Sequence, residues 1–211
     1  MDKKEYWESR FLAEGKIWGE LPSLSAHYAS ALFLENNVKS VLVPGSGYGR
    51  NTKLFSTLGL NVTGVEISET AFKMASQFDP ESKFYRGTVL DMSCDNLKYD
   101  AIYCFNVLHL FRQQDRELFL RECVSKLKDG GLAFFTVFSN KEESFGQGDE
   151  AEPGTFESKP GRPVHYFTEK DLKQHFHLFE IIDIGTFEDP ENHGGHAHVH
   201  VLRYIAAKLK V

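Results

Sequence analysis

Residues 39–58 pass from a short apolar segment, through a turn with three alternate glycines, into a helix-like segment. The apolar segment at 39–44 (KSVLVP) is typical of a strand, and Gly45, Gly47 and Gly49 follow it at every second position. Glycine lets a backbone approach a ligand closely, and the free N–H groups at the start of a helix attract polar or anionic groups. The unit therefore predicts a nucleotide-type cofactor site, although the glycine pattern alone also fits a tight turn.

Strand-like and helix-like segments alternate along the rest of the chain, which is typical of a mostly parallel sheet with helices on both faces. The expected strands are 39–44, 61–66, 83–87, 100–107, 132–138, 179–187 and 198–206, and the expected helices are 50–58, 68–77, 115–128 and 168–176. We expect Asp129-Gly130-Gly131 to end the third helix. The last two strands have no helix between them and can pair as an antiparallel edge. We therefore predict one α/β domain over residues 1–211.

Composition excludes several partners. The 211 residues carry a net charge of −6 and no Lys/Arg block with interleaved aromatic residues, so we expect no nucleic-acid partner. The longest apolar run, at 132–138, has the length of a strand rather than of a membrane span.

Cys94, Cys104 and Cys123 form no CxxC pair, and no apolar signal segment follows the basic N-terminus. These features predict a reduced, cytoplasmic protein. The oligomeric state cannot be read from the sequence.

Two acidic residues follow the next two strands along the chain. Glu66 ends the second strand, where a carboxylate can accept both hydroxyls of a ribose. Asp91 follows the third strand, where it can accept from an adenine amino group, with Leu90 and Met92 on either side of the ring. Ligands of such sheets bind outside the carboxyl ends of the strands. A dinucleotide fingerprint would have a glycine where Arg50 stands, which disfavours NAD.

These segments together resemble the class I S-adenosylmethionine-dependent methyltransferases. VLVPGSGYGRN resembles the first motif of that family, GVEIS its ribose-binding acid, VLDMS its adenine-binding segment and YDAIYCFNVLHLF its fourth strand. The resemblance implies a Rossmann-like methyltransferase fold whose final strand is antiparallel, and S-adenosylmethionine as cofactor. The cofactor-binding residues that it implies are Trp7, Trp18, Gly45, Ser46, Gly47, Gly49, Glu66, Ile67, Asp91, Met92 and Asn106.

The branch of the family stays open. Most members carry an acid where Val43 stands, and the Pro44 form together with EYWESRFLAEGKIW (5–18) resembles the thiopurine and thiol methyltransferases. GRNT and HYFTEKDL are instead similar to the tellurite-resistance methyltransferases. The thiol branch implies that residues 1–37 fold over the cofactor, with Trp7 and Trp18 as part of the cover. Alternatively, these two residues are ordinary packing aromatics.

Residues 139–163 (SNKEESFGQGDEAEPGTFESKPGRP) differ from the rest in their content of Gly, Pro and Glu. Such a stretch fits a disordered surface loop equally well as a lid over a site. We expect a lid-like loop here.

The resemblance implies methyl transfer to a small-molecule acceptor, such as a thiol or another soft nucleophile. A thiolate needs little help from a base, whereas a hydroxyl or amine needs a general base within hydrogen-bond reach. His109, after the fourth strand, and His165, after the lid-like segment, are the candidate catalytic residues. A nicotinamide-dependent oxidoreductase and a non-catalytic cofactor-binding module are the alternative functions.

His196, His198 and His200 alternate near the C-terminus, so on a strand they would share one face. Pairs of the form H-x-H can hold zinc, but such a site needs a further ligand and an open cavity. Transfer from a sulfonium needs no metal. We therefore expect half-exposed histidines on an edge strand and no metal site.

Overall fold

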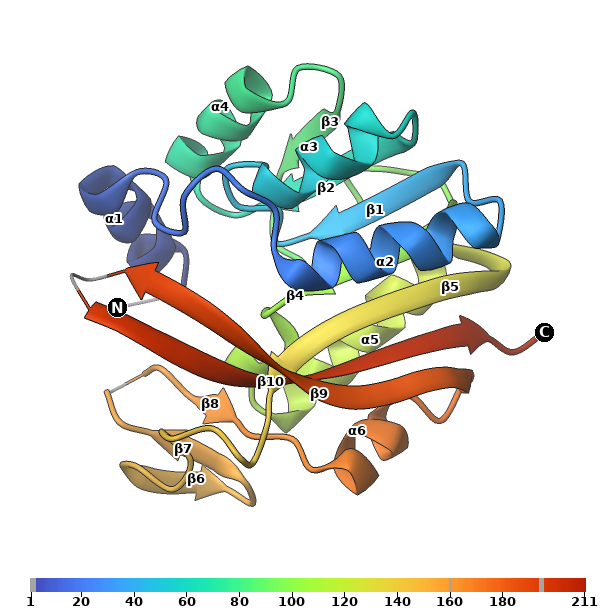
Figure 1. Cartoon of the computed structure of the whole chain (residues 1–211). Helices are drawn as coiled ribbons and strands as arrows, with labels where there is room; N and C mark the ends of the chain where they lie inside the picture. The colour runs from blue at the N-terminus through green and yellow to red at the C-terminus, as the bar shows by residue number, and fades with distance from the viewer. Residues whose placement is uncertain (1–2, 160, 194–195) are drawn as a thin grey trace.

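The computed structural model describes residues 3–159, 161–193 and 196–211, and its main feature is a sheet in the order β3-β2-β1-β4-β5-β10-β9 (Figure 1). The strands are β1 Ser40–Pro44, β2 Asn61–Glu66, β3 Lys83–Arg86, β4 Tyr99–Phe105, β5 Leu127–Phe138, β9 Phe179–His193 and β10 His196–Leu209. Strands β1 to β5 pair in parallel, whereas β10 is antiparallel to both β5 and β9. The expected mostly parallel sheet with an antiparallel edge is confirmed.

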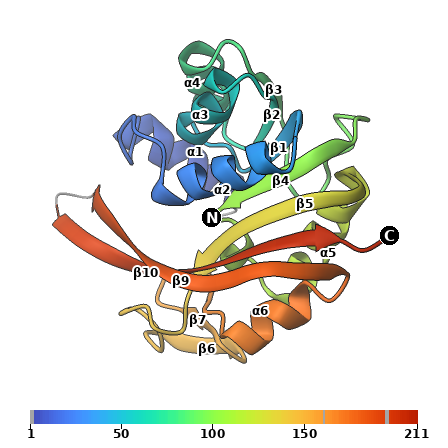
Figure 2. The same cartoon turned by 45° about the vertical axis from the view of Figure 1, so that its right-hand side comes forward.

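Helices cover both faces of this sheet (Figures 1 and 2). They are α1 Lys3–Glu14, α2 Leu24–Glu35, α3 Arg50–Thr57, α4 Glu69–Phe78, α5 Gln113–Lys126 and α6 Glu169–His175, with a 3₁₀ turn at Leu108–Leu110. Helices α2, α3 and α4 lie on one face, and α5 and α6 lie on the other. Within the described ranges, every helix is too short or too polar to cross a membrane.

Both faces of the central strands are buried, because successive side chains point to opposite helix layers. Val41 and Val43 of β1 pack in one cluster with Phe55 of α3, whereas Leu42 packs in the other cluster with Phe119 of α5. This burial on both faces explains why the sequences of these strands are continuous apolar runs rather than alternating ones.

Helix ends follow the local signals with one exception. The hydroxyls of Ser68 and Thr168 accept hydrogen bonds from N–H groups three residues further on, and they cap α4 and α6. Residues 129–131 do not end α5, so that prediction was wrong. The helix ends at Lys126 because Leu127 already has extended dihedral angles and begins β5.

The described part of the N-terminal segment, residues 3–37, divides into two parts. Helix α1 contacts α4, near the carboxyl end of β1. Helix α2 instead packs on β4 and β5 beside α3, so it belongs to the helix layer of the sheet.

Most of residues 139–163 are structured. β6 Asp149–Glu152 and β7 Thr155–Glu157 form a small antiparallel sheet with β8 Val164–His165. The alternative of a disordered loop does not hold for these strands.

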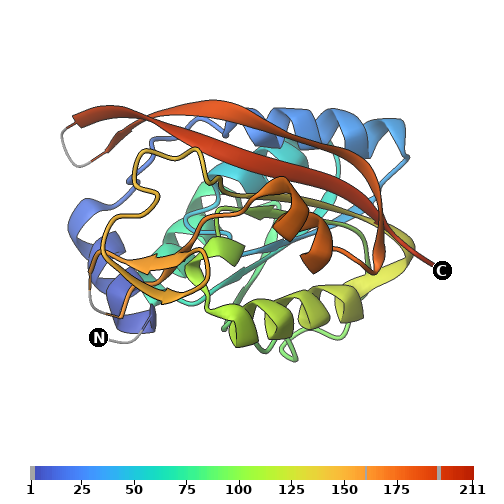
Figure 3. The same cartoon turned by 90° about the horizontal axis from the view of Figure 1, so that it is seen from below.

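The last two strands are longer than expected. β5 pairs only with Leu202–Lys208 of β10, so the preceding part of the β9–β10 ribbon projects beyond the sheet. Pro190 would be expected in a turn, but it lies on the outer strand β9, opposite Val199 of β10. An edge strand tolerates proline because its outer N–H groups have no ladder partner. The projecting ribbon, the small sheet and α1 gather at the end toward which β1 points (Figures 1 and 3).

Candidate active site

The glycine turn lies where the strand order reverses, with β2 on one side of β1 and β4 on the other. Gly45 and Gly47 have φ values of +69° and +56°, which glycine adopts without strain. The N–H groups of Gly45 and Ser46 both donate to the carbonyl of Val65, at 2.8 and 3.1 Å. These bonds hold the turn against β2 and leave its outer surface open for a ligand.

Glu66 connects this turn to the next helix. Its carboxylate accepts from the N–H of Gly47 and from the N–H of Ser68, both at 2.8 Å. Burial raises the pKa of Glu66, and the backbone hydrogen bonds partly offset that shift. The residue is 5% exposed, yet it lies on a cavity wall. It is therefore both a structural brace and a candidate acceptor for a ligand hydroxyl.

A cavity of ≈ 650 Å³ opens beside these residues, which is a volume suited to a small-molecule ligand. It brings together eight of the predicted cofactor residues: Trp7, Trp18, Gly45, Ser46, Gly47, Glu66, Ile67 and Asn106. Ser46 Oγ is buried and has no hydrogen-bond partner among the described residues. This hydroxyl faces Gly64 of β2, since a Cβ on Gly64 would lie 2.7 Å from it.

An aromatic cluster closes one side of the cavity. Trp18 stacks on Tyr48 with ring centroids 6.2 Å apart, and Trp7 and Phe11 pack against Trp18 at similar distances. Glu8 ties this part of α1 to α4, because its carboxylate accepts from Ser68, Thr70 and the N–H of Thr70.

Three predicted cofactor residues lie elsewhere. Asp91 is exposed and its carboxylate accepts from the N–H of Ser93, whereas Met92 is fully buried in the core. After β3 the chain reaches the cavity at residues 88–90 and turns away at Asp91, so the acid points to solvent. Gly49 begins α3 with φ +89° and does not line the cavity.

His109 lies on the cavity wall at the end of β4. Its ring stacks on Phe138 with centroids 4.2 Å apart, and Nδ1 is buried without a hydrogen-bond partner in the described part of the chain. Burial, together with the nearby His200 and His165, lowers the pKa of His109 to about 3. The ring is therefore neutral near pH 7.

This buried histidine predicts a pH-dependent stability. Below about pH 6.5 the unfolded chain takes up a proton at this position, whereas the folded chain does not until about pH 3, so folding weakens as the pH falls. We expect this effect to cost about 2 kcal/mol at pH 5. His109→Phe keeps an aromatic ring that can stack on Phe138 but cannot take up a proton. The variant should therefore lose about 2 kcal/mol less unfolding free energy than the wild type between pH 7.5 and pH 5, as measured by urea unfolding. The exposed His27→Ala is the control, and an equal loss in wild type and His109→Phe would contradict the prediction.

His165 does not line the cavity. Its Nδ1 is 2.7 Å from Thr155 Oγ1 and its Nε2 is 2.6 Å from Asp171 Oδ2, so both ring nitrogens are engaged. The residue ties the small sheet to α6. The structure thus places it outside the wall of this cavity.

His198 and His200 share one face of β10, as the alternation predicts. Their Nε2 atoms are 3.1 Å apart, and His200 lies on the cavity wall with Glu191 of β9. The side chain of His196 lies outside the described residues.

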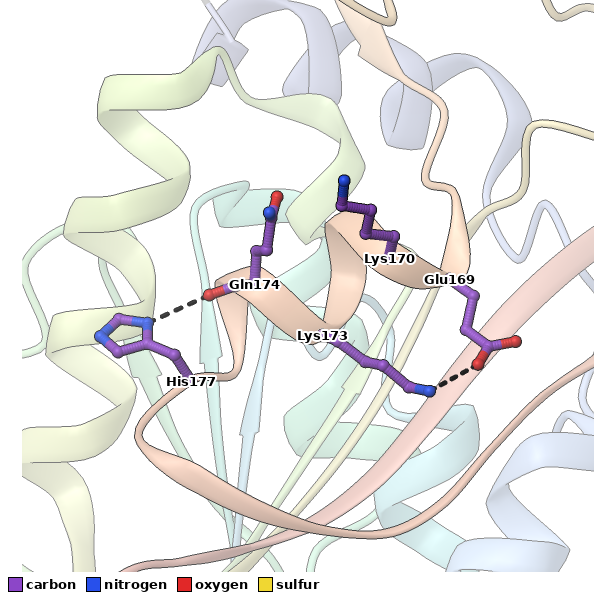
Figure 4. Close-up of a pocket in the computed structure, with 5 residues that line it drawn as sticks. All are labelled: Glu169, Lys170, Lys173, Gln174 and His177. Carbon is purple, nitrogen blue, oxygen red and sulfur yellow. Dashed lines mark hydrogen bonds and ion pairs between the residues drawn. The ribbon is translucent and has the colours of Figure 1, made fainter.

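A second hollow lies on the outer surface of α6, away from the glycine turn (Figure 4). Its lining residues are Glu169, Lys170, Lys173, Gln174 and His177. Lys173 pairs with Glu169 of its own helix at 2.6 Å, and the other side chains point in different directions. Such an arrangement presents no convergent polar groups to a ligand.

Residues 42–135 match the family model described as a methyltransferase domain. This segment, a little under half of the chain, is therefore similar to methyltransferase domains. The ubiquinone biosynthesis O-methyltransferase of Nitrosomonas europaea is 24% identical over 145 residues, which are 66% of this chain and 60% of that protein. The chain thus spans less than two thirds of the length of the curated relatives that it matches.

Solved structures share the fold of this chain over nearly its whole length. One was described for the conversion of a disulfide bond into a thioacetal group during echinomycin biosynthesis, with a TM-score of 0.76, 15% identity and coverage of 99% of this chain and 92% of the other. The 1,6-didemethyltoxoflavin-N1-methyltransferase of Burkholderia thailandensis has a TM-score of 0.72 and 20% identity, with coverage of 99% and 87%. That structure holds S-adenosylhomocysteine and 1,6-didemethyltoxoflavin.

The sequence analysis did not predict several of the residues that line the cavity. Tyr48 lies inside the glycine motif, where its position next to three glycines was the available signal. Arg50, Arg162 and Glu191 also line the cavity. Glu191 had no local signal, because only the pairing of β9 with β10 brings it there.

Proposed function

We propose that this chain binds S-adenosylmethionine in the cavity and transfers its methyl group to a small-molecule acceptor. The observation that carries the proposal is the glycine turn braced by Glu66 on the wall of a cavity at the switch point of the sheet. The backbone of Gly45 and Gly47 would face the amino-acid part of the cofactor, and Glu66 its ribose.

The reaction would be an in-line displacement. A lone pair of the acceptor forms a bond to the methyl carbon while the carbon–sulfur bond of the sulfonium breaks, and S-adenosylhomocysteine leaves. The cofactor is already activated, so the protein mainly positions the two partners. The acceptor loses its proton before or after the transfer.

We infer that the acceptor carries a soft nucleophile, such as a thiol, that ionises without a strong base. His109 supports this choice, because a group with a pKa of about 3 removes protons from a thiol or hydroxyl poorly. In this proposal His109 positions the acceptor through a hydrogen bond. His165, whose ring nitrogens are both engaged, takes no part.

The proposed site also assigns a role to the flanking segments. Trp7 of helix α1 and Trp18 just beyond it would cover the cofactor, and residues 161–163, between β7 and β8 of the small sheet, would border the acceptor. In this scheme residues 1–211 act as a single domain.

Intrinsic fluorescence tests the cofactor directly. Trp7 and Trp18 are the chain's two tryptophans, and both line the cavity, so a ligand bound there should change their emission. We expect a saturable change with S-adenosylmethionine and S-adenosylhomocysteine and none with NAD. A response to NAD alone would favour a nicotinamide oxidoreductase.

Transfer is then measured with a methyl-labelled cofactor and a panel of small thiols, phenols and amines. Labelled product from a thiol is the expected result. Saturable cofactor binding without transfer to any acceptor would instead favour the non-catalytic binding module.

A further inference from the structure

Two histidines and a glutamate lie close together beside the cavity, at a place that the proposed methyl transfer leaves unused, and the glutamate and one histidine line the cavity. Glu191, His198 and His200 each have one potential metal-ligand atom, and these three atoms lie within 4.8 Å of one another. The Nε2 atoms of the two histidines are 3.1 Å apart, and His200 Nε2 is 4.0 Å from Glu191 Oε2.

The pairing of the projecting ribbon produces this convergence. His198 lies directly opposite Glu191 across β9 and β10, and His200 is two residues further along the same face. Side chains of directly opposed residues lie on the same side of a sheet. The three donors are thus placed by the ribbon's ladder of backbone hydrogen bonds rather than by a loop.

A buried carboxylate orients His200. Glu142 Oε1 is 2.6 Å from His200 Nδ1, and Glu142 Oε2 accepts from the N–H of Val201 at 2.6 Å. A carboxylate at Nδ1 holds the proton on that nitrogen and leaves the Nε2 lone pair toward His198 and Glu191. Histidines that bind metals are typically held in this way by an outer carboxylate.

The local charge also favours a cation. Three buried or half-buried carboxylates, those of Glu142, Asp189 and Glu191, lie near His200, and the guanidinium of Arg50 is 3.5 Å from Glu191. Asp189 lies opposite His200 in the ribbon, and its Oδ2 is buried without a hydrogen-bond partner among the described residues. A buried orphan carboxylate oxygen is costly unless a positive partner is present.

We propose that Glu191, His198 and His200 bind a divalent transition metal of the zinc class. Two imidazoles and one carboxylate are the protein ligands of a catalytic type of zinc site, which keeps a further position open. Glu191 and His200 line the cavity, so an anionic sulfur or oxygen ligand in the cavity can occupy that position. The proposal departs from the sequence expectation of no metal, because the structure supplies the further ligand and the cavity that the histidines alone lacked.

Zinc binding to the untagged full chain tests the site in the absence of any methyl donor or acceptor, so its outcome is independent of the proposed function. After removal of metal with a chelator, equilibrium dialysis against Zn²⁺ should show one tightly bound ion per chain. We expect His200→Ala and Glu191→Gln to weaken binding at least tenfold. Glu142→Gln should weaken it about 10–100-fold through loss of orientation.

Two control variants test whether zinc binds at an exposed histidine or cysteine instead. His27→Ala and Cys94→Ser change exposed groups and should bind Zn²⁺ as the wild type does. No stoichiometric zinc in the wild type, or unchanged zinc affinity in folded His200→Ala and Glu191→Gln, would overturn the proposal.

X-ray absorption at the zinc edge of the loaded wild type provides a test that needs no variant. Two imidazoles with only nitrogen and oxygen neighbours are expected. A sulfur neighbour from a cysteine, or fewer than two imidazoles, would place the ion elsewhere and refute the site.

Discussion

Gly45→Ala is expected to weaken cofactor binding at least a hundredfold and to lower the free energy of unfolding by about 2–5 kcal/mol. A Cβ on Gly45 would lie 2.5 Å from Val107 Cγ2, and the backbone at this position has φ +69°. The left-handed conformation costs roughly 1–2 kcal/mol for a residue with a side chain, and overpacking costs about 1–3 kcal/mol more. Urea unfolding and calorimetric titration with S-adenosylmethionine measure the two effects.

Gly59→Ala is the matched control for Gly45. Gly59 has φ +81°, but no atom lies within 4 Å of the added Cβ, so only the backbone cost of about 1–2 kcal/mol should remain. The double variant Gly45→Ala/Val107→Ala removes the close contact and should recover part of the lost stability. Cofactor affinity in Gly45→Ala equal to that of the wild type would show that the turn does not contact the cofactor.

Glu66→Gln is expected to weaken cofactor binding about 10–100-fold and to destabilise the fold by about 1.5–3 kcal/mol, the range for a hydrogen bond to a charged group. The two carboxylate oxygens each accept a backbone N–H, one from Gly47 and one from Ser68. An amide can replace only one of these acceptors, and its NH₂ group would face the other N–H. The turn and the start of α4 would then lose their common brace.

Glu69→Gln is a charge-matched control three residues away. Glu69 is exposed and pairs with Lys73 and Arg86 on the surface, so its loss should change stability by about 0.5 kcal/mol or less. Calorimetric titration and urea unfolding apply to both variants. Equal behaviour of Glu66→Gln and Glu69→Gln would argue against any special role of Glu66.

The sequence alone determined those features that depend on local backbone chemistry. The Gly45–Gly49 turn, the caps at Ser68 and Thr168, and the buried parallel strands were predictable because each depends on dihedral angles, hydrogen bonds or apolar runs within a few residues. Glu66 was predictable for the same reason, since its position at the end of a strand places it beside the turn.

Tertiary structure decided where the less local residues point. Asp91 turns to solvent because the chain leaves the cavity after residue 90, and the end of α5 follows from the early start of β5 rather than from Gly130. Likewise, Glu142, Glu191 and His200 meet only because β9 pairs with β10 in one register and the segment after β5 folds beneath them. A shift of that register by one residue would turn every side chain of the ribbon to the other face, and no short stretch of sequence specifies it.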